Sequence, residues 1–154
     1  MARAPKPLRF RVPSKSDLMG LPTDVIDEIG HLLNCLQHGD DANEPNIRRF
    51  GEDRRISHVV KIVSDGSDGN TYRCAATVEF SEGIWVIDVF AKKSTSGIST
   101  PKIDLDRIHH RLKSLEEYRK TAAGMADIEG MKNEYKQMRK NLGLPDSSNT
   151  PGRK

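Results

Sequence analysis

Cysteine is scarce in this chain, and long apolar runs are missing. The two cysteines, Cys35 and Cys74, form neither a CxxC pair nor a Cys/His ligand set, so we expect no disulfide framework and no zinc site. No stretch approaches a membrane span, and the start of the chain lacks the apolar run of a signal peptide. We therefore expect a cytoplasmic protein without membrane contact, metal or cofactor.

Aromatic residues are also few, at 5%, and hydrophobic residues make up only 35% of the 154 positions, whereas charged residues reach 31%. Such a composition predicts one small core with polar extensions. The net charge of +3 is modest, and residues 120–154 carry seven basic and four acidic side chains, which leaves 18 of each sign before them. The body can therefore bind nucleic acid only if its charges are segregated.

The order of charges along the chain indicates such segregation. The predicted helix at residues 23–38 carries acidic side chains, whereas basic residues flank the start and the end of the predicted sheet. The basic residues at the two ends of the sheet are Arg48, Arg49, Arg54, Arg55 and Lys61, then Lys92, Lys93 and Lys102. A basic face opposite an acidic one is one interpretation, and scattered surface charge is the other.

Hydrophobic periodicity divides the chain into short strands and amphipathic helices. The predicted strands are residues 8–12, 57–63, 71–80 and 84–90; the predicted helices are a short turn after Ser14 or Ser16, residues 23–38, Asp104 to Arg119 and Asp127 to Leu142. We expect a loop at residues 40–53 and an interruption at Gly124. Val25, Ile29, Leu33 and Leu36 share one helix face and should be core residues.

These elements predict an α+β fold, in which a small antiparallel sheet of about four strands is packed by two N-terminal helices and followed by C-terminal helices. The expected organisation is a flexible lead (1–7), a folded domain (8–119), a helical extension (120–142) and a disordered tail (143–154). The extension's apolar stripe needs a surface, either on the same domain or on a partner.

The most informative segment follows the apolar strand 84–90. Lys92 and Lys93 supply mobile positive charges, Ser94 and Thr95 supply hydroxyl donors, and Gly97 lets backbone N–H groups approach an anion. These groups suit a phosphodiester backbone. The alternative is a solvated strand end with protective lysines.

An ordered set of motifs surrounds this segment. It comprises Gly69-Asn70-Thr71-Tyr72-Arg73, Thr77-Val78-Glu79-Phe80, Trp85-Val86-Ile87-Asp88-Val89-Phe90-Ala91-Lys92-Lys93-Ser94, Gly97-Ile98 and Thr100-Pro101. In this combination the chain resembles phage-derived HigB-like toxins of the RelE/ParE toxin–antitoxin superfamily, from about Leu8 to about Arg119. The resemblance implies a RelE/ParE-like fold and a toxin that cleaves mRNA on the ribosome without a metal.

The resemblance also implies a catalytic set of Arg73, Lys92 and Lys93. Arg73 would contact the scissile phosphate, unless it only pairs with Glu79 or Glu82. The two lysines cannot share one face of a continuing strand, and the sequence leaves open which of them joins Arg73. A lysine beside other cations could move protons or act only through its charge.

The remaining residues with an expected role would position RNA: Arg48, Arg49, Arg54, Arg55, Lys61, Ser94 and Thr95. Lys61 and Asp88 depart from the pattern of the resembled family, and Asp88 could orient a lysine or a histidine or simply pair with Arg73. The expected partners are the ribosome with its mRNA and a helix-turn-helix, HigA-like antitoxin. Operator DNA would be bound only through this antitoxin. A non-catalytic RelE/ParE-like binding protein, or a phage regulatory protein, is the alternative.

Overall fold

The computed structural model describes residues 3–92 and 100–145. Its elements in chain order are β1 (Leu8–Phe10), α1 (Ser14–Met19), α2 (Thr23–Gln37), β2 (Ile47–Arg49), a 3₁₀ turn η1 (Arg54–Ile56), β3 (Val60–Asp65), β4 (Thr71–Thr77), β5 (Ile84–Lys92), α3 (Lys102–Arg119) and α4 (Ala122–Asn141). None of the described helices is long and apolar enough to cross a membrane. The predicted α+β class, with two N-terminal helices and helices after the sheet, is confirmed.

The sheet contains five strands in the order β1-β5-β4-β3-β2. β2 to β5 are antiparallel neighbours, as expected, but β1 pairs with β5 in parallel, so the sheet is mixed rather than purely antiparallel. The additional strand is β2, which lies where a loop was expected at residues 40–53. A three-residue edge strand with two exposed arginines carries too little apolar pattern to reveal itself in the sequence.

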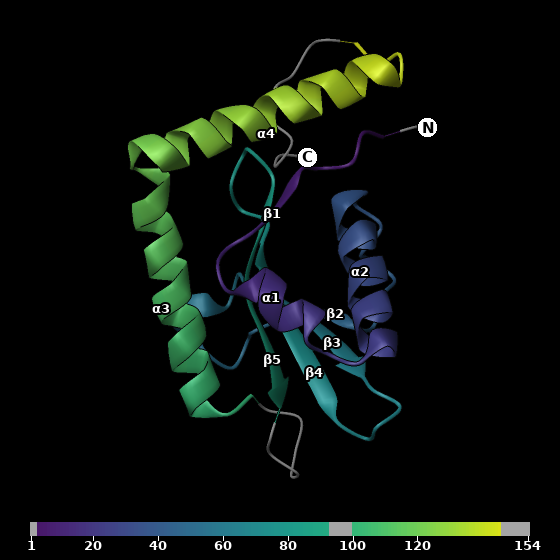
Figure 1. Cartoon of the computed structure of the whole chain (residues 1–154), viewed down its shortest axis with the longest axis vertical. Helices are drawn as coiled ribbons and strands as arrows, with labels where there is room; N and C mark the ends of the chain where they lie inside the picture. Colours follow the sequence, from purple (N-terminus) through teal and green to yellow (C-terminus); the bar gives the residue numbers. More distant parts are fainter. Residues whose placement is uncertain (1–2, 93–99, 146–154) are drawn as a thin grey trace.

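Helices cover both faces of the sheet (Figure 1). The apolar stripe of α2 packs with one face, and Val25, Ile29, Leu33 and Leu36 are all buried there, as predicted. α3 packs on the other face together with Trp85 and other buried residues of the sheet and of the β2–β3 connection. The result is a three-layer arrangement of α2, sheet and α3.

The last helix crosses the end of α3 (Figure 1). Met131 of α4 is fully buried in the core beneath α3, and Arg9 of β1 forms an ion pair with Glu134 at 2.9 Å. The surface that the stripe of α4 needs is therefore supplied, at least around Met131, by the same domain. Residues 3–7 also contact the domain, since Ala4 is buried and Gln37 donates to the Lys6 carbonyl.

Gly124 was expected to interrupt the C-terminal helices, but it lies inside α4. The chain turns at Thr121, whose hydroxyl caps α4 by accepting the Gly124 N–H at 3.0 Å. The glycine is needed for space, because a Cβ at Gly124 would overlap the carbonyl oxygen of Tyr118 and lie 2.6 Å from its carbonyl carbon. Close packing of two helix ends, rather than helix breaking, explains this residue.

Replacement of Gly124 by Ala should destabilise the domain by roughly 1–3 kcal/mol, because the overlap is with backbone that cannot rotate away. Gly130→Ala in the same helix is the matched control. It meets nothing within 4 Å and should stabilise the protein by up to about 1 kcal/mol through helix propensity. Thermal or urea unfolding measures both, and equal stability of the two variants would contradict the packing account.

Candidate nucleic-acid interface

Strand register brings four basic side chains to one face of the sheet. Arg48 pairs with Lys61 across β2 and β3, and Lys61 in turn faces Ala75 of β4. Arg73 lies two residues before Ala75 in β4. Thr71 lies two residues before Arg73 and is opposite Lys92 of β5. Because alternate residues share a face, Arg48, Lys61, Arg73 and Lys92 point to the same side. We call these four residues the basic face.

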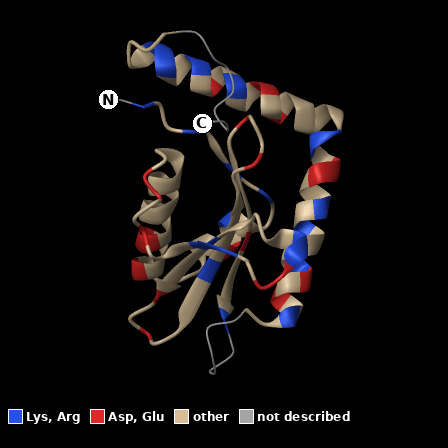
Figure 2. Ribbon diagram, turned by 180° about the vertical axis from the view of Figure 1, so that it is seen from behind, with Lys and Arg blue, Asp and Glu red and all other residues tan. Residues whose placement is uncertain are grey.

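The basic face is on the α3 side of the sheet, since Ala75 packs in the same cluster as α3. In Figure 2, Lys and Arg positions cross the strands between α2 and α3, whereas α2 carries Asp and Glu. The only charged residues of α2 are Asp24, Asp27 and Glu28. α2 is thus acidic, whereas the α3 side of the sheet carries basic groups together with acidic partners such as Glu52 and Asp88.

Strand register shows on which face of the sheet Lys92 lies, which the sequence left open. β5 contains a bulge, because Ala75 faces Asp88 while Ala76 faces Val86. Ile87 is the extra residue, so the side chains of Ile87 and Asp88 both lie on the α3 side of the sheet. From Asp88 onward, side chains again alternate between the two faces. Lys92 therefore shares a face with Arg73. Lys93 lies outside the described residues.

Solvent exposure differs strongly within the basic face. Arg73 is 3% exposed and Lys61 is 7% exposed, whereas Arg48 is exposed and Lys92 is half-buried. Burial, and then the nearby charge of Arg48, lowers the pKa of Arg73, although Glu52 opposes the shift. Arginine keeps its charge nevertheless, and a charge held beneath the surface acts through a lower dielectric than one in water.

The surroundings of Lys92 on the basic face lower its pKa. Its partial desolvation lowers its pKa first, and the positive charges of Arg73 and Lys61 lower it further. A lysine with a lowered pKa can give and take a proton nearer neutral pH than an ordinary lysine can.

Glu52 supports the basic face from the loop after β2. Its carboxylate accepts a hydrogen bond from Lys61 Nζ at 2.9 Å and one from the Thr100 N–H at 3.1 Å. Burial alone would raise the pKa of Glu52, but these bonds outweigh it and hold the pKa at about 2. Lys61 also lies over the Phe50 ring, 4.9 Å from its centroid. Lys61 therefore has Glu52 as its counter-ion.

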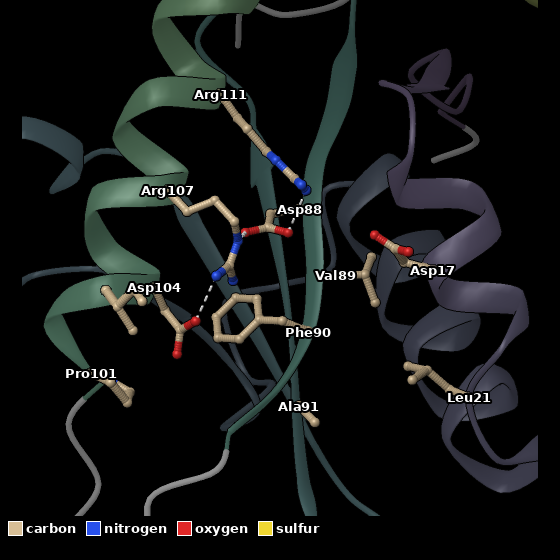
Figure 3. Close-up of a pocket in the computed structure, with 11 residues that line it drawn as sticks. Asp17, Leu21, Asp88, Val89, Phe90, Ala91, Pro101, Asp104, Arg107 and Arg111 are labelled. Carbon is tan, nitrogen blue, oxygen red and sulfur yellow. Dashed lines mark hydrogen bonds and ion pairs between the residues drawn. The ribbon is translucent and has the colours of Figure 1, made fainter.

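A second charged cluster lies beside the basic face, where α3 meets β5 (Figure 3). Asp88 is 1% exposed and accepts from Arg107 Nε at 2.8 Å and from Arg111 Nη1 at 2.6 Å. Arg107 also donates to Asp104 at 2.7 Å. Burial raises the pKa of Asp88, and the two arginines counteract that shift. Asp88 therefore joins α3 to the sheet.

The same cluster borders a hollow of about 590 Å³ between α1 and α3. Its floor is β5 from Asp88 to Ala91, beyond the part that β1 covers at Ile84–Val86. Leu21 lies across the hollow from the side chains of α3 in Figure 3. The hollow is adjacent to the basic face along β5, and its arginines are already bound to Asp88.

The other residues with a predicted RNA role are more dispersed. Arg49 follows Arg48 and so points to the opposite face of the sheet. Arg54 is exposed in η1, and Arg55 beside it is held by Asp53 and Asp106, each at 2.7 Å. Ser94 and Thr95 lie outside the described residues.

Several contacts differ from the pairs that the sequence suggested. Glu82, considered as a partner of Arg73, is fully buried and instead binds Arg119 Nε and Trp85 Nε1, both at 2.7 Å. Glu79 pairs with His58 at 2.8 Å. The roles of Glu52, Arg107 and Arg111 were not predicted from the sequence, although arginines at i and i+4 on one helix face were a usable signal.

The fold and this face define a class: an α+β domain, broadly consistent with the RelE fold, whose sheet carries buried and exposed cations on one side. Comparison with known families agrees. The model of the family described as "Phage derived protein Gp49-like (DUF891)" matches residues 16–113, more than half of the chain. The protein belongs to this family, which is of the RelE/HigB-like toxin type. Searches of curated proteins and of solved structures found no match.

Asp88→Asn should cost about 3 kcal/mol of stability, because it removes the shared partner of two half-buried arginines. Glu117→Gln is the control: its exposed pair with Lys120, at 3.5 Å, should contribute less than about 1 kcal/mol. Urea unfolding compares them, and similar losses in both variants would show that Asp88 does not hold α3 on the sheet.

Glu52 should make stability depend on pH. Its pKa in the folded protein is about 2 against an ordinary 4.5, so its contribution is full above pH 4.5 and is lost as the pH falls toward 2. The stability difference between wild type and Glu52→Gln should therefore shrink between about pH 6 and about pH 3. A difference that stays constant over this range, measured by urea unfolding, would contradict the Lys61–Glu52 assignment.

Proposed function

We propose that the protein is a HigB-like toxin of a type II toxin–antitoxin system, an endoribonuclease that cleaves mRNA on the ribosome without a metal. The observation that carries the proposal is the basic face, four cations from four neighbouring strands, in a chain of a toxin-type family. A surface of this kind suits a substrate whose backbone is negatively charged.

Metal-independent RNA cleavage makes three demands on a site. A proton must leave the 2′-OH that attacks the phosphate, the charge that develops on the phosphate must be neutralised, and the departing 5′-oxygen must gain a proton. Lys92 is suited to one of the two proton transfers because its pKa is lowered. Arg73 and Lys61 are suited to charge neutralisation because they are desolvated cations beside it.

RNA would be positioned by the more exposed basic residues. Arg48 lies on the basic face and Arg54 lies in η1, on the side of the sheet that α3 covers. Arg49, Arg55, Lys93, Ser94 and Thr95 complete the proposed set, although Arg55 is already held by two aspartates. Contacts of this kind fix the RNA backbone without reading its sequence.

The proposed partners follow from this activity. The ribosome would present the mRNA, and a helix-turn-helix, HigA-like antitoxin would cover the basic face and bind operator DNA. An antitoxin that supplies carboxylates to Arg48 and Lys92 would compete directly with RNA phosphates for the same cations.

One observation favours the alternative of a RelE/ParE-like protein that inhibits its target by contact. Arg73 is 3% exposed and Lys61 is 7% exposed, which suits a structural charge as well as a catalytic one. A contact inhibitor would bind through the exposed Arg48 and would not need proton transfer at Lys92.

Substitutions at Lys92 separate the two functions. Lys92→Arg retains the positive charge but, with its much higher pKa, cannot exchange protons near neutral pH. If Lys92 is an acid or base, Lys92→Arg and Lys92→Ala should both reduce mRNA cleavage by about 10²–10⁴-fold. If only charge matters, Lys92→Arg should keep most of the activity. Growth after induction and primer extension of mRNA ends are the measurements.

Two further variants complete the test. Arg73→Ala should reduce cleavage by about 10²–10³-fold if the guanidinium stabilises the transition state. Lys113→Ala, on an exposed lysine of α3 that is 64% exposed, is the control and should cleave like wild type. Growth inhibition without new mRNA ends would support the contact inhibitor, and full cleavage by both Arg73→Ala and Lys92→Ala would refute the proposed site.

A further inference from the structure

Three side chains of the kinds that bind metals lie together at α2, on the sheet face opposite the basic face. His31 and Cys35 are four residues apart on the helix, so their side chains meet, and Cys35 Sγ is 3.6 Å from His31 Nε2. Glu44 reaches the pair from the loop after α2, and ligand atoms of all three residues lie within 4.8 Å of one another. No Cys/His ligand set and no zinc site were expected from the sequence, but His31 and Cys35 form a Cys/His pair at helical spacing.

The distance between sulfur and nitrogen suits zinc. In a tetrahedral site a sulfur at about 2.3 Å and a nitrogen at about 2.0–2.1 Å from Zn²⁺ are about 3.6 Å apart, which the pair already matches. The carboxylate of Glu44 would have to move closer by up to about 1.4 Å, which a side chain in a loop can do by rotation. One sulfur, one nitrogen and one oxygen ligand favour Zn²⁺ over Mg²⁺ or Ca²⁺, which prefer oxygen alone.

The surroundings also favour a cation. Asp40 and Asp41 lie in the same loop as Glu44, and all three place negative charge near Cys35. A divalent ion would relieve this excess of negative charge. The loop is held in place, because the Asp40 N–H donates to the Cys35 carbonyl at 2.9 Å and the Glu44 N–H donates to Asp41 at 3.2 Å.

We propose that His31, Cys35 and Glu44 form a site for a zinc-type divalent ion, with water in the fourth position. The ion joins the C-terminal half of α2 to the loop that leads into β2, where Arg48 lies. Its role is structural, because α2 packs on the opposite face from Lys61, Arg73 and Lys92. The inference does not rest on the proposed nuclease function.

Cobalt provides a direct test with the reduced full-length protein after chelator treatment. One equivalent of Co²⁺ should produce a sulfur-to-cobalt charge-transfer absorption, because Cys35 is the accessible thiol and Cys74 is fully buried. Zn²⁺ should displace Co²⁺ and raise the melting temperature in proportion to the logarithm of its concentration, whereas Mg²⁺ should do neither.

Single substitutions identify the ligands. Cys35→Ser should abolish the absorption, and His31→Ala and Glu44→Gln should each weaken binding. For His31→Ala we expect a loss of at least about 100-fold, since even an outer partner of a ligand is worth about 10–100-fold. His110→Ala, which removes an exposed histidine of α3, is the control and should bind like wild type.

Two results would overturn the proposal. One is the absence of the charge-transfer absorption with equimolar Co²⁺, together with a melting temperature that Zn²⁺ leaves unchanged. The other is absorption that persists in Cys35→Ser, or equal affinity in His31→Ala and His110→Ala. Circular dichroism of each variant before metal is added shows whether the fold is retained. Because Glu44 lies in a loop, Glu44→Gln tests the site even if a helix variant unfolds.

Discussion

The buried carboxylate of Asp88 joins helix α3 to the sheet, and the rest of this sheet face depends on that contact. Asp88 lies on β5 at 1% exposure, and Arg107 and Arg111 reach it from successive turns of α3. An ionised carboxylate in such a position is costly unless it is paired, and each arginine lowers that cost. These ion pairs fix α3 beside β5, near one edge of the sheet.

The position of α3 determines what the rest of that sheet face can do. The α2 side of the sheet is largely apolar and is covered by Val25, Ile29 and other members of the α2 stripe. On the α3 side, Lys61 comes from β3 and Arg73 from β4, the strands that follow β5 across the sheet. There Lys61 has a polar partner, Glu52, instead of an apolar neighbour from a helix. One face therefore forms the core, while the other combines a smaller core with a cluster of cations.

Some of this arrangement could be predicted from the sequence, because it depends on local periodicity. The core stripe of α2, the hairpin of β4 and β5 and the basic ends of the strands all follow from spacing of two or of three to four residues. The bulge at Ile87 could not be predicted, and it places Lys92 on the same face as Arg73. Gly124 was similarly misinterpreted, since its role is contact with Tyr118 from another helix. Long-range pairing leaves no periodic signal in a single sequence.

The proposed cleavage of RNA at the basic face, through attack by the 2′-OH, can be tested by the chemistry of the cut ends. In a purified translation system, the wild-type protein should make ribosome-dependent cuts that leave a 2′,3′-cyclic phosphate or 3′-phosphate upstream and a 5′-OH downstream. Cuts that leave a 3′-OH and a 5′-phosphate would indicate attack by water instead, which is typical of metal-dependent nucleases. Those ends, or no cuts at all, would contradict the account.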